Sequence, residues 1–304
     1  MRLTHRILAV LFLLFASARM VADKASLITL DVAVTDKNGH PVAGLEQRQF
    51  KIFEDDIEQT ITRFGPSPKP VNAVLLVEFS DTFASYEDVV EPAIGLINSL
   101  PSNSWIALVT FGIQPAVVLD FTRDRTALTA RLRGLQMPLS REAALYDAVS
   151  FVLERLAGLP GKNAVFLLST GHDTISKRGY SDAMKMAQTS DSTIYSIGLA
   201  EFARPEVTAM EPGAGIARLQ AENVMRSFAE ASGGLFYFPR FAGEYPWMYE
   251  NARADVTYQY RLAYVSTNQT ASAKLRKLRV EVADIDINND GKADKLKVRH
   301  KKGY

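Results

Sequence analysis

The sequence predicts an α/β fold: a doubly wound, mostly parallel sheet with one antiparallel edge strand. Residues 71–77 form an almost unbroken apolar run that ends at Glu78-Phe79-Ser80-Asp81-Thr82, and residues 165–169 repeat this layout before Thr170. A continuous apolar run is typical of a strand that is buried on both faces of a parallel sheet. Helical patterns fall between most such strands, which indicates helices on both faces.

The individual elements follow from the same periodicities. One helix is predicted where Leu145, Val149, Val152, Leu153 and Leu156 share a face, and another over residues 217–231, where Gly233-Gly234 would end it. The strands at 105–111 and 116–121 are so close in sequence that they must form an antiparallel hairpin. We expect strands at residues 71–79, 105–111, 116–121, 164–169, 193–199 and 235–238.

The segments on either side of this α/β domain (71–256) show only strand patterns. Residues 28–34, 258–264 and 278–282 alternate apolar and polar side chains, and Asp36-Lys37-Asn38-Gly39 is typical of a hairpin turn. The proline-rich stretch 65–70 indicates a linker. Neither flank has enough apolar residues for its own core, so we expect 27–64 and 258–304 to form one small β-sandwich into which the α/β domain is inserted.

The N-terminus has the order of a signal peptide. Arg2 and Arg6 precede an apolar stretch, and Ala16-Ser17-Ala18 follows it, which predicts a leader over residues 1–18 and a secreted or periplasmic protein. An uncleaved anchor is the alternative, although the stretch is short for a membrane span. Cleavage would change the formal net charge from +1 to −1, which favours neither nucleic acid nor membrane as a partner. The chain has no cysteine and therefore no disulfide or thiolate chemistry.

Several motifs resemble a known family. They are Val-Ala-Val-Thr-Asp-Lys-Asn-Gly-His-Pro-Val-Ala-Gly-Leu at 32–45, Phe-Lys-Ile-Phe-Glu-Asp at 50–55, Ala-Leu-Tyr-Asp-Ala at 144–148, Leu-Leu-Ser-Thr-Gly at 167–171 and Lys-Gly-Tyr at 302–304. The α/β zone resembles a von Willebrand factor type A domain, and the chain from residue 27 onwards resembles the bacterial secreted proteins that carry one. The resemblance implies a Rossmann-like fold and a non-catalytic, protein-binding function.

The resemblance also implies a metal-ion-dependent adhesion site, which in the family is built from Asp-x-Ser-x-Ser, a distant threonine and a distant aspartate. Here the motif is Glu78-x-Ser80-x-Thr82, and the two distant positions are Ala143 and Thr170. The longer Glu78 side chain and the missing oxygens predict a degenerate site, because Mg²⁺ demands near-ideal octahedral geometry. We expect the loops 78–82, 141–143 and 170–173, here called the crest, to bind a partner protein.

The residues expected to contact that partner are Asp81, Arg141, Glu142, His172 and Asp173. Asp147 and Asp173 are also candidates for substitute metal ligands, although a helix start and a turn cap explain them better. Ser80 and His172, with Asp147 or Asp173, would be the members of a hydrolase alternative.

A second candidate cation site follows the pattern Asp-x-Asn-x-Asp-Gly. Its ligands would be Asp286, Asn288, Asp290 and Asp294, with Gly291 allowing the turn. Lys297 stands where a helix–loop–helix calcium site needs a glutamate, so the loop is either a weak calcium site between strands or an ordinary turn. A calcium-binding β-sandwich acting as a cell-envelope scaffold is therefore the alternative function.

Two further clusters are interpreted as structural. The aromatic residues at 236–249 are expected in the core, since large aromatic side chains are mostly buried. The basic residues near the C-terminus are expected on a solvated sheet face: Lys274, Arg276, Lys277, Arg279, Lys295, Lys297, Arg299, Lys301 and Lys302.

Overall fold

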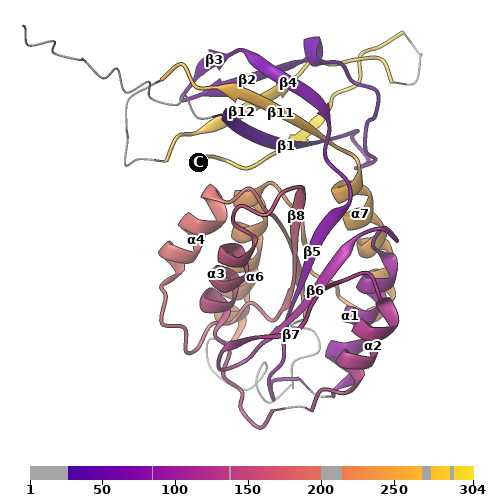
Figure 1. Ribbon diagram of the computed structural model, residues 1–304, viewed down its shortest axis with the longest axis vertical. Helices are drawn as coiled ribbons and strands as arrows, with labels where there is room; N and C mark the ends of the chain where they lie inside the picture. The colour runs from indigo at the N-terminus through magenta and orange to yellow at the C-terminus, as the bar shows by residue number, and fades with distance from the viewer. Residues whose placement is uncertain (1–26, 84, 137, 200–213, 269–274, 288–290) are drawn as a thin grey trace, which may run out of the picture.

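The computed structural model describes residues 27–83, 85–136, 138–199, 214–268, 275–287 and 291–304. Two layered bodies are stacked along the long axis, a β-sandwich at one end and a larger α/β domain at the other (Figure 1). The predicted leader, residues 1–18, lies outside the described residues. No helix within the described ranges has the length and apolar character needed to cross a membrane.

The α/β domain is built on a six-stranded sheet in the order β10-β9-β8-β5-β6-β7. Neighbouring strands are parallel except β7, which pairs antiparallel with β6 at the edge. The predicted sheet and its antiparallel edge are therefore confirmed. The strands are β5 (Val71–Glu78), β6 (Trp105–Phe111), β7 (Pro115–Thr122), β8 (Lys162–Ser169), β9 (Thr193–Gly198) and β10 (Phe236–Tyr237).

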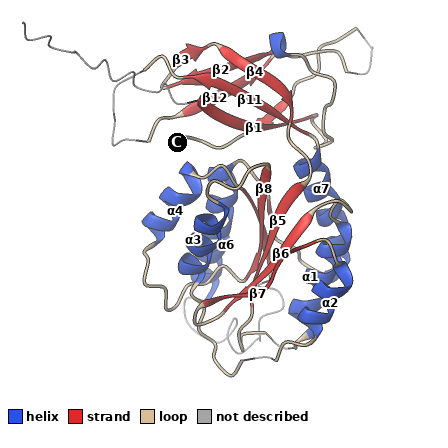
Figure 2. Ribbon diagram, viewed as in Figure 1, coloured by secondary structure: helices blue, strands red, loops and turns tan. Residues whose placement is uncertain are grey.

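Helices cover both faces of this sheet, as Figure 2 shows. One core contains α1 (Glu87–Ser99), α2 (Arg125–Arg133) and α7 (Tyr245–Thr257), and the other contains α3 (Leu145–Leu156), α4 (Tyr180–Thr189) and α6 (Ala214–Ser232). Alternate residues of β5 enter the two cores: Leu75 packs in the first and Leu76 in the second. α6 ends where predicted, because Gly233 adopts φ +83° and the Gly234 amide donates back to the Ala229 carbonyl at 2.8 Å.

The β-sandwich joins the two ends of the chain. β1 pairs antiparallel with β11, so Leu30 lies opposite Leu262. A four-stranded sheet, β13-β1-β11-β4, and a three-stranded sheet, β12-β2-β3, share a third core. The prediction that the flanking segments fold together is confirmed. The strands are β1 (Leu27–Thr35), β2 (Phe50–Glu54), β3 (Ile57–Gln59), β4 (Ile61–Pro66), β11 (Gln259–Val265), β12 (Leu278–Val282) and β13 (Lys297–Arg299), with short 3-10 helices η1 (Gln47–Gln49) and η3 (Ala242–Glu244).

The stretch 65–70 is only partly a connection. Gly65 and Pro66 pair with Arg261 and Tyr260 as the end of β4, so residues 67–70 alone link the sandwich to β5. The return connection is shorter still, because α7 ends at Thr257 and β11 begins at Gln259. The two domains are therefore joined by two very short segments.

The aromatic cluster is not uniformly buried. Tyr237, Tyr245 and Tyr249 belong to the core, but Phe241 is 61% exposed and Trp247 is 63% exposed. The core expectation is wrong for these two residues. In α7 the positions 245, 248, 249 and 252 face the sheet, and Trp247 falls on the opposite side of the helix.

The basic C-terminal cluster is not simply a solvated face. Arg276 donates to the buried Glu54 at 2.6 Å, Lys301 donates to Asp191 at 2.6 Å, and Arg299 contacts Asp255. Lys301 and its neighbour His300 are buried. The expectation is wrong at Arg276 because its partner Glu54 is buried in the sandwich. It is wrong at residues 299–301 because the end of the chain packs against α6 and the α/β domain, and the Lys302 amide donates to the Ala231 carbonyl at 3.1 Å.

Candidate functional site

The crest lies at the end of the molecule opposite the β-sandwich. β5 starts beside the sandwich and runs away from it to Glu78, and β8 runs parallel to β5 and ends at Ser169 (Figure 1). The exit loops of these strands therefore meet at one rim, where ligands of open α/β sheets bind.

Glu78 is the centre of this rim, and its carboxylate is buried and fully engaged. Ser80 Oγ donates to Glu78 Oε1 at 3.1 Å. Ser169 Oγ (2.8 Å), the Thr170 amide (2.8 Å) and Thr170 Oγ1 (2.9 Å) all donate to Glu78 Oε2. Glu78 is 1% exposed, and Ser80, Ser169 and Thr170 are at most 2% exposed. The carboxylate thus binds the hydroxyls and backbone of two strand-exit loops together.

These residues offer Mg²⁺ fewer ligands than the adhesion-site pattern described above. Ala143, which is buried, has no side-chain oxygen, and the Glu78 carboxylate already accepts four hydrogen bonds. Thr82 Oγ1 is directed to the Arg141 carbonyl at 3.4 Å. In the part of the chain that the structure describes, no three acidic or histidine side chains are grouped to hold an ion.

Segment 140–144 forms backbone hydrogen bonds with the loops that follow β5, β6 and β8. The Asp81 amide donates to the Ser140 carbonyl (2.8 Å), the Ala144 amide to the Gly112 carbonyl (2.7 Å), and the Thr174 amide to the Ala143 carbonyl (2.9 Å). A Cβ on Gly112 would lie 2.9 Å from the Phe79 carbonyl oxygen, so the loops pack closely as well. Three loops from different parts of the sequence are therefore held against one segment.

Aliphatic side chains project beside these hydrogen bonds. Leu139 is 98% exposed, Ile113 is 58% exposed and Ile175 is 45% exposed. Each is the immediate neighbour of a residue that bonds to or belongs to segment 140–144. Nothing in the sequence marks these three residues, because an aliphatic residue carries no signal for a surface position.

The predicted partner-binding residues have different roles. Arg141 and Glu142 are exposed, and Arg141 Nε lies 4.0 Å from Asp81 Oδ2. Glu142 contacts the Thr174 hydroxyl. Asp173 instead accepts from the Tyr146 amide at 3.1 Å, which caps the start of α3.

The hydrolase arrangement is not assembled among the described residues. Ser80 donates to Glu78, and Asp147 accepts from the amides of Lys177 and Arg178 at 2.9 Å each. His172 has a half-buried side chain and makes no hydrogen bond with Ser80, Asp147 or Asp173. Both aspartates accept backbone hydrogen bonds, but not as expected: Asp147 in the first turn of α3 binds the loop at 177–178, and Asp173 binds the start of α3.

The candidate calcium loop is partly outside the described residues, which omit Asn288 and Asp290. Asp286 Oδ2 accepts from the Gly291 amide at 2.8 Å, and Asp294 Oδ2 accepts from the Ile287 amide at 3.2 Å. Gly291 has φ +83°, as the turn requires. These contacts are those of an Asp- and Gly-stabilised turn, and the calcium site stays a prediction.

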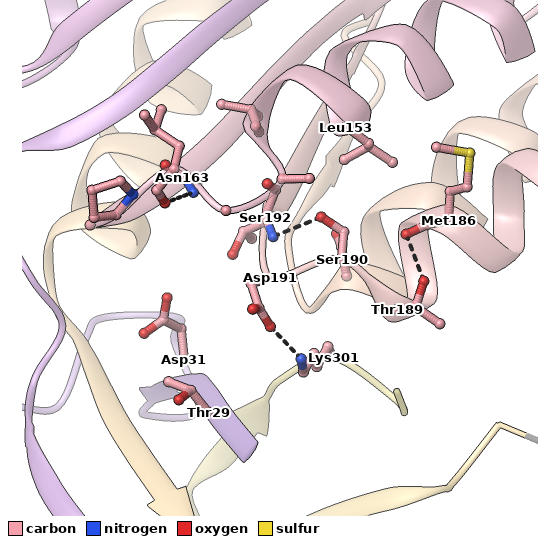
Figure 3. Close-up of a pocket in the computed structure, with 18 of the residues that line it drawn as sticks. Thr29, Asp31, Leu153, Asn163, Met186, Thr189, Ser190, Asp191, Ser192 and Lys301 are labelled. Atoms are coloured by element: carbon pink, nitrogen blue, oxygen red, sulfur yellow. Dashed lines mark hydrogen bonds and ion pairs between the residues drawn. The ribbon is translucent and has the colours of Figure 1, made fainter. Parts of the chain in front are cut away.

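A cavity of about 550 Å³ lies far from the crest, at the junction of the two domains. Figure 3 shows Thr29 and Asp31 of β1 on one side of it and Asp191 and Ser192 of the α4–β9 loop on another, with Lys301 bonded to Asp191. Lys162, which is fully buried, lies between Gly161 and Asn163, two of the residues that line this cavity. A lysine at the start of a mainly apolar strand is the sequence feature that could have indicated a buried charge here.

Comparison with known protein families and with curated proteins gives no match. Among solved structures, the vWF domain of the type V pili tip protein Mfa5 from Porphyromonas gingivalis is similar at 11% identity, with a TM-score of 0.47, covering 67% of this chain and 99% of that one. An aerotolerance-related membrane protein from Bacteroides fragilis, carrying multiple mutations to serine, has 13% identity, a TM-score of 0.46 and coverages of 62% and 98%.

Proximal thread matrix protein 1 from the mussel byssus, with a zinc-occupied MIDAS motif, has 11% identity and a TM-score of 0.47, over 67% of this chain and 49% of that one. These structures include domains of the von Willebrand factor type, which the sequence resembles. At such identities and scores the comparisons carry no argument about ligand or partner, and the fold rests on the strand order given above.

Proposed function

We propose that this chain is an exported, non-catalytic protein-binding module whose crest docks a partner protein without a metal ion. The observation that carries the metal-free part of the proposal is the closed cluster around Glu78, whose carboxylate accepts four hydrogen bonds from Ser80, Ser169 and Thr170. A cation bound by this carboxylate would have to compete with these bonds inside a buried site.

The surroundings of the cluster support a docking role. The crest loops are fixed to segment 140–144 by backbone hydrogen bonds, so their surface is largely preformed. Exposed Leu139, Ile113 and Ile175 supply apolar contact area, and Arg141 and Glu142 supply polar contacts between them. Such a combination suits a folded protein surface with recesses for the aliphatic side chains.

The metal-free part of the proposal is tested on the purified protein. Titration with Mg²⁺, Mn²⁺ and Ca²⁺ is followed by calorimetry and by the thermal unfolding midpoint. We expect no saturable heat and no shift from Mg²⁺ or Mn²⁺. A Mn²⁺ response that disappears in Ser80→Ala would contradict the closed cluster, whereas a Ca²⁺ response that disappears in Asp286→Asn would assign the ion to the other loop.

The docking part is tested by site-specific photo-crosslinking in intact cells of the source. A photoreactive residue replaces Leu139 beside the crest or, as a matched control, Ile57, which is 56% exposed on the sandwich. We expect a discrete adduct from position 139 that persists in chelator and is lost in Arg141→Glu. Adducts from position 57 alone would favour the envelope scaffold that binds through its β-sandwich.

A further inference from the structure

Lys162 is the most deeply buried charge in the part of the molecule that the structure describes. It opens β8 at the edge of the sheet that faces the sandwich, and it is 0% exposed. Its ammonium donates to Asp31 Oδ2 (2.9 Å), Thr193 Oγ1 (2.9 Å) and Gln259 Oε1 (2.5 Å). Asp31 and Gln259 belong to the sandwich, so this one ammonium joins the two domains.

Asp31 receives a second cation from its own domain. Arg261 donates two hydrogen bonds of 2.8 Å to Asp31, from Nε to Oδ1 and from one terminal nitrogen to Oδ2. The Arg261 guanidinium also donates to the Gly161 carbonyl of the α/β domain at 3.2 Å. Burial by itself would raise the pKa of Asp31, but the Lys162 ammonium and the Arg261 guanidinium outweigh burial and hold that pKa well below its usual range. Asp31 is therefore charged throughout the physiological range.

Residues of the same network form hydrogen bonds across both connections between the domains. At the first, Ser67 Oγ donates to Asp31 Oδ1 at 3.0 Å and the Ser67 amide donates to the Gln259 carbonyl at 2.8 Å. At the second, Gln259 Nε2 donates to Asp255 Oδ2 at 3.1 Å, across the single residue that separates α7 from β11. Tyr195 of β9 also donates to Asp255 Oδ2, at 2.8 Å.

Short connections are natural hinges, since few residues need to change backbone angles for two domains to rotate. Here both are bridged by side chains, and separating the two domains would take Lys162 away from Asp31, its carboxylate partner, which is strongly unfavourable. We propose that this network is a hinge lock: Lys162 holds the sandwich and the α/β domain in one relative orientation and so fixes the direction in which the crest points.

The chain offers a matched control for the lock. Lys301 also crosses between the C-terminal segment and the α/β domain, but its partner Asp191 has a side chain that is 76% exposed. Because Asp191 is largely solvated, this pair contributes less to stability and rigidity than the buried pair of Lys162 and Asp31. Lys301→Met therefore removes a lysine from the same junction without removing the lock.

The test measures the distribution of distances between the domains by electron paramagnetic resonance on the full chain. Because the protein has no cysteine, Glu58→Cys on the sandwich and Leu139→Cys beside the crest provide two unique labelling positions. We expect one narrow distribution in the parent and in Lys301→Met. It should broaden in Lys162→Met, which leaves Asp31 paired with Arg261, and in the double variant Asp31→Asn/Lys162→Met, which removes both charges of the pair that joins the domains.

Narrow distributions in both Lys162 variants would overturn the lock. If neither variant folds, hydrogen exchange on the parent protein decides instead. The lock requires the Ser67 amide, which bonds across the first connection, to exchange as slowly as the slowest amides of β5. Fast exchange of that amide would show a hinge that opens on its own and would reject the proposal.

Discussion

The crest and the domain junction each bury a carboxylate, and they satisfy it in opposite ways. Glu78 accepts hydrogen bonds only from hydroxyls and a backbone amide among its described partners, whereas Asp31 is held by an ammonium and a guanidinium. The Glu78 cluster fixes loops within one domain. The Asp31 network fixes two domains to each other.

The two regions should therefore respond differently when the buried carboxylate is substituted. Neutral donors lose a hydrogen bond when the carboxylate is removed, but they are not left as buried charges. Lys162, in contrast, is fully buried and would lose its carboxylate counter-ion. The junction should therefore be the more sensitive region, and the following variants test that ranking.

Asp31→Ala should have the largest effect. It leaves the fully buried Lys162 without its counter-ion, and we expect the free energy of unfolding to fall by about 3–5 kcal/mol. Urea denaturation measures the change. Asp191→Ala removes the partner of Lys301, whose side chain is 9% exposed, and should cost less than Asp31→Ala because Asp191 itself is largely solvated. Equal losses in the two variants would contradict the special role of the Asp31 network.

A second test uses pH at the same junction. The Val280 amide donates to His300 Nε2 at 3.1 Å, so the buried ring is neutral. Burial lowers the pKa of His300 from 6.5 to about 4. The unfolded state therefore takes up the proton first, and stability should fall by about 3 kcal/mol as pH falls from 6.5 to 4. Denaturation across this range should show that His300→Gln, compared with the parent, lacks this part of the loss.

Glu78→Ala probes the crest. It leaves Ser80, Ser169 and Thr170 without their common acceptor, and we expect a loss of about 2 kcal/mol, smaller than for Asp31→Ala. Glu142→Ala, at an exposed position on the same rim, is the control and should change stability by less than about 0.5 kcal/mol. A stabilised Glu78→Ala protein would show that the cluster is strained rather than satisfied.

Arg141→Ala should have the smallest effect on the fold. Its side chain is exposed and lies 4.0 Å from Asp81, so the free energy of unfolding should change by less than about 0.5 kcal/mol. Thermal unfolding at low and high salt checks this. A large loss would mean that Arg141 supports the crest instead of being available to a partner.

Much of the fold could be predicted because its signals are local. The apolar run of β5, the helical spacing from Leu145 to Leu156 and the glycines after α6 each specify an element from neighbouring residues. The insertion of one domain into another also followed, because neither flank had enough apolar surface for its own core. The exposed Trp247 was missed, since composition does not tell which side of a helix faces the sheet.

The candidate site was also predictable only in part. The apolar runs alone place Glu78, Ser80 and Thr170 at the ends of buried strands and at one rim, because parallel strands end at a common edge. The bonds from Ser169 and Thr170 to Glu78, more than ninety positions away, could be found only in the folded molecule. The same holds for the pairing of Lys162 with Asp31 across the domain junction. Such pairings depend on which side chains burial brings within reach, and local sequence periodicity carries no record of them.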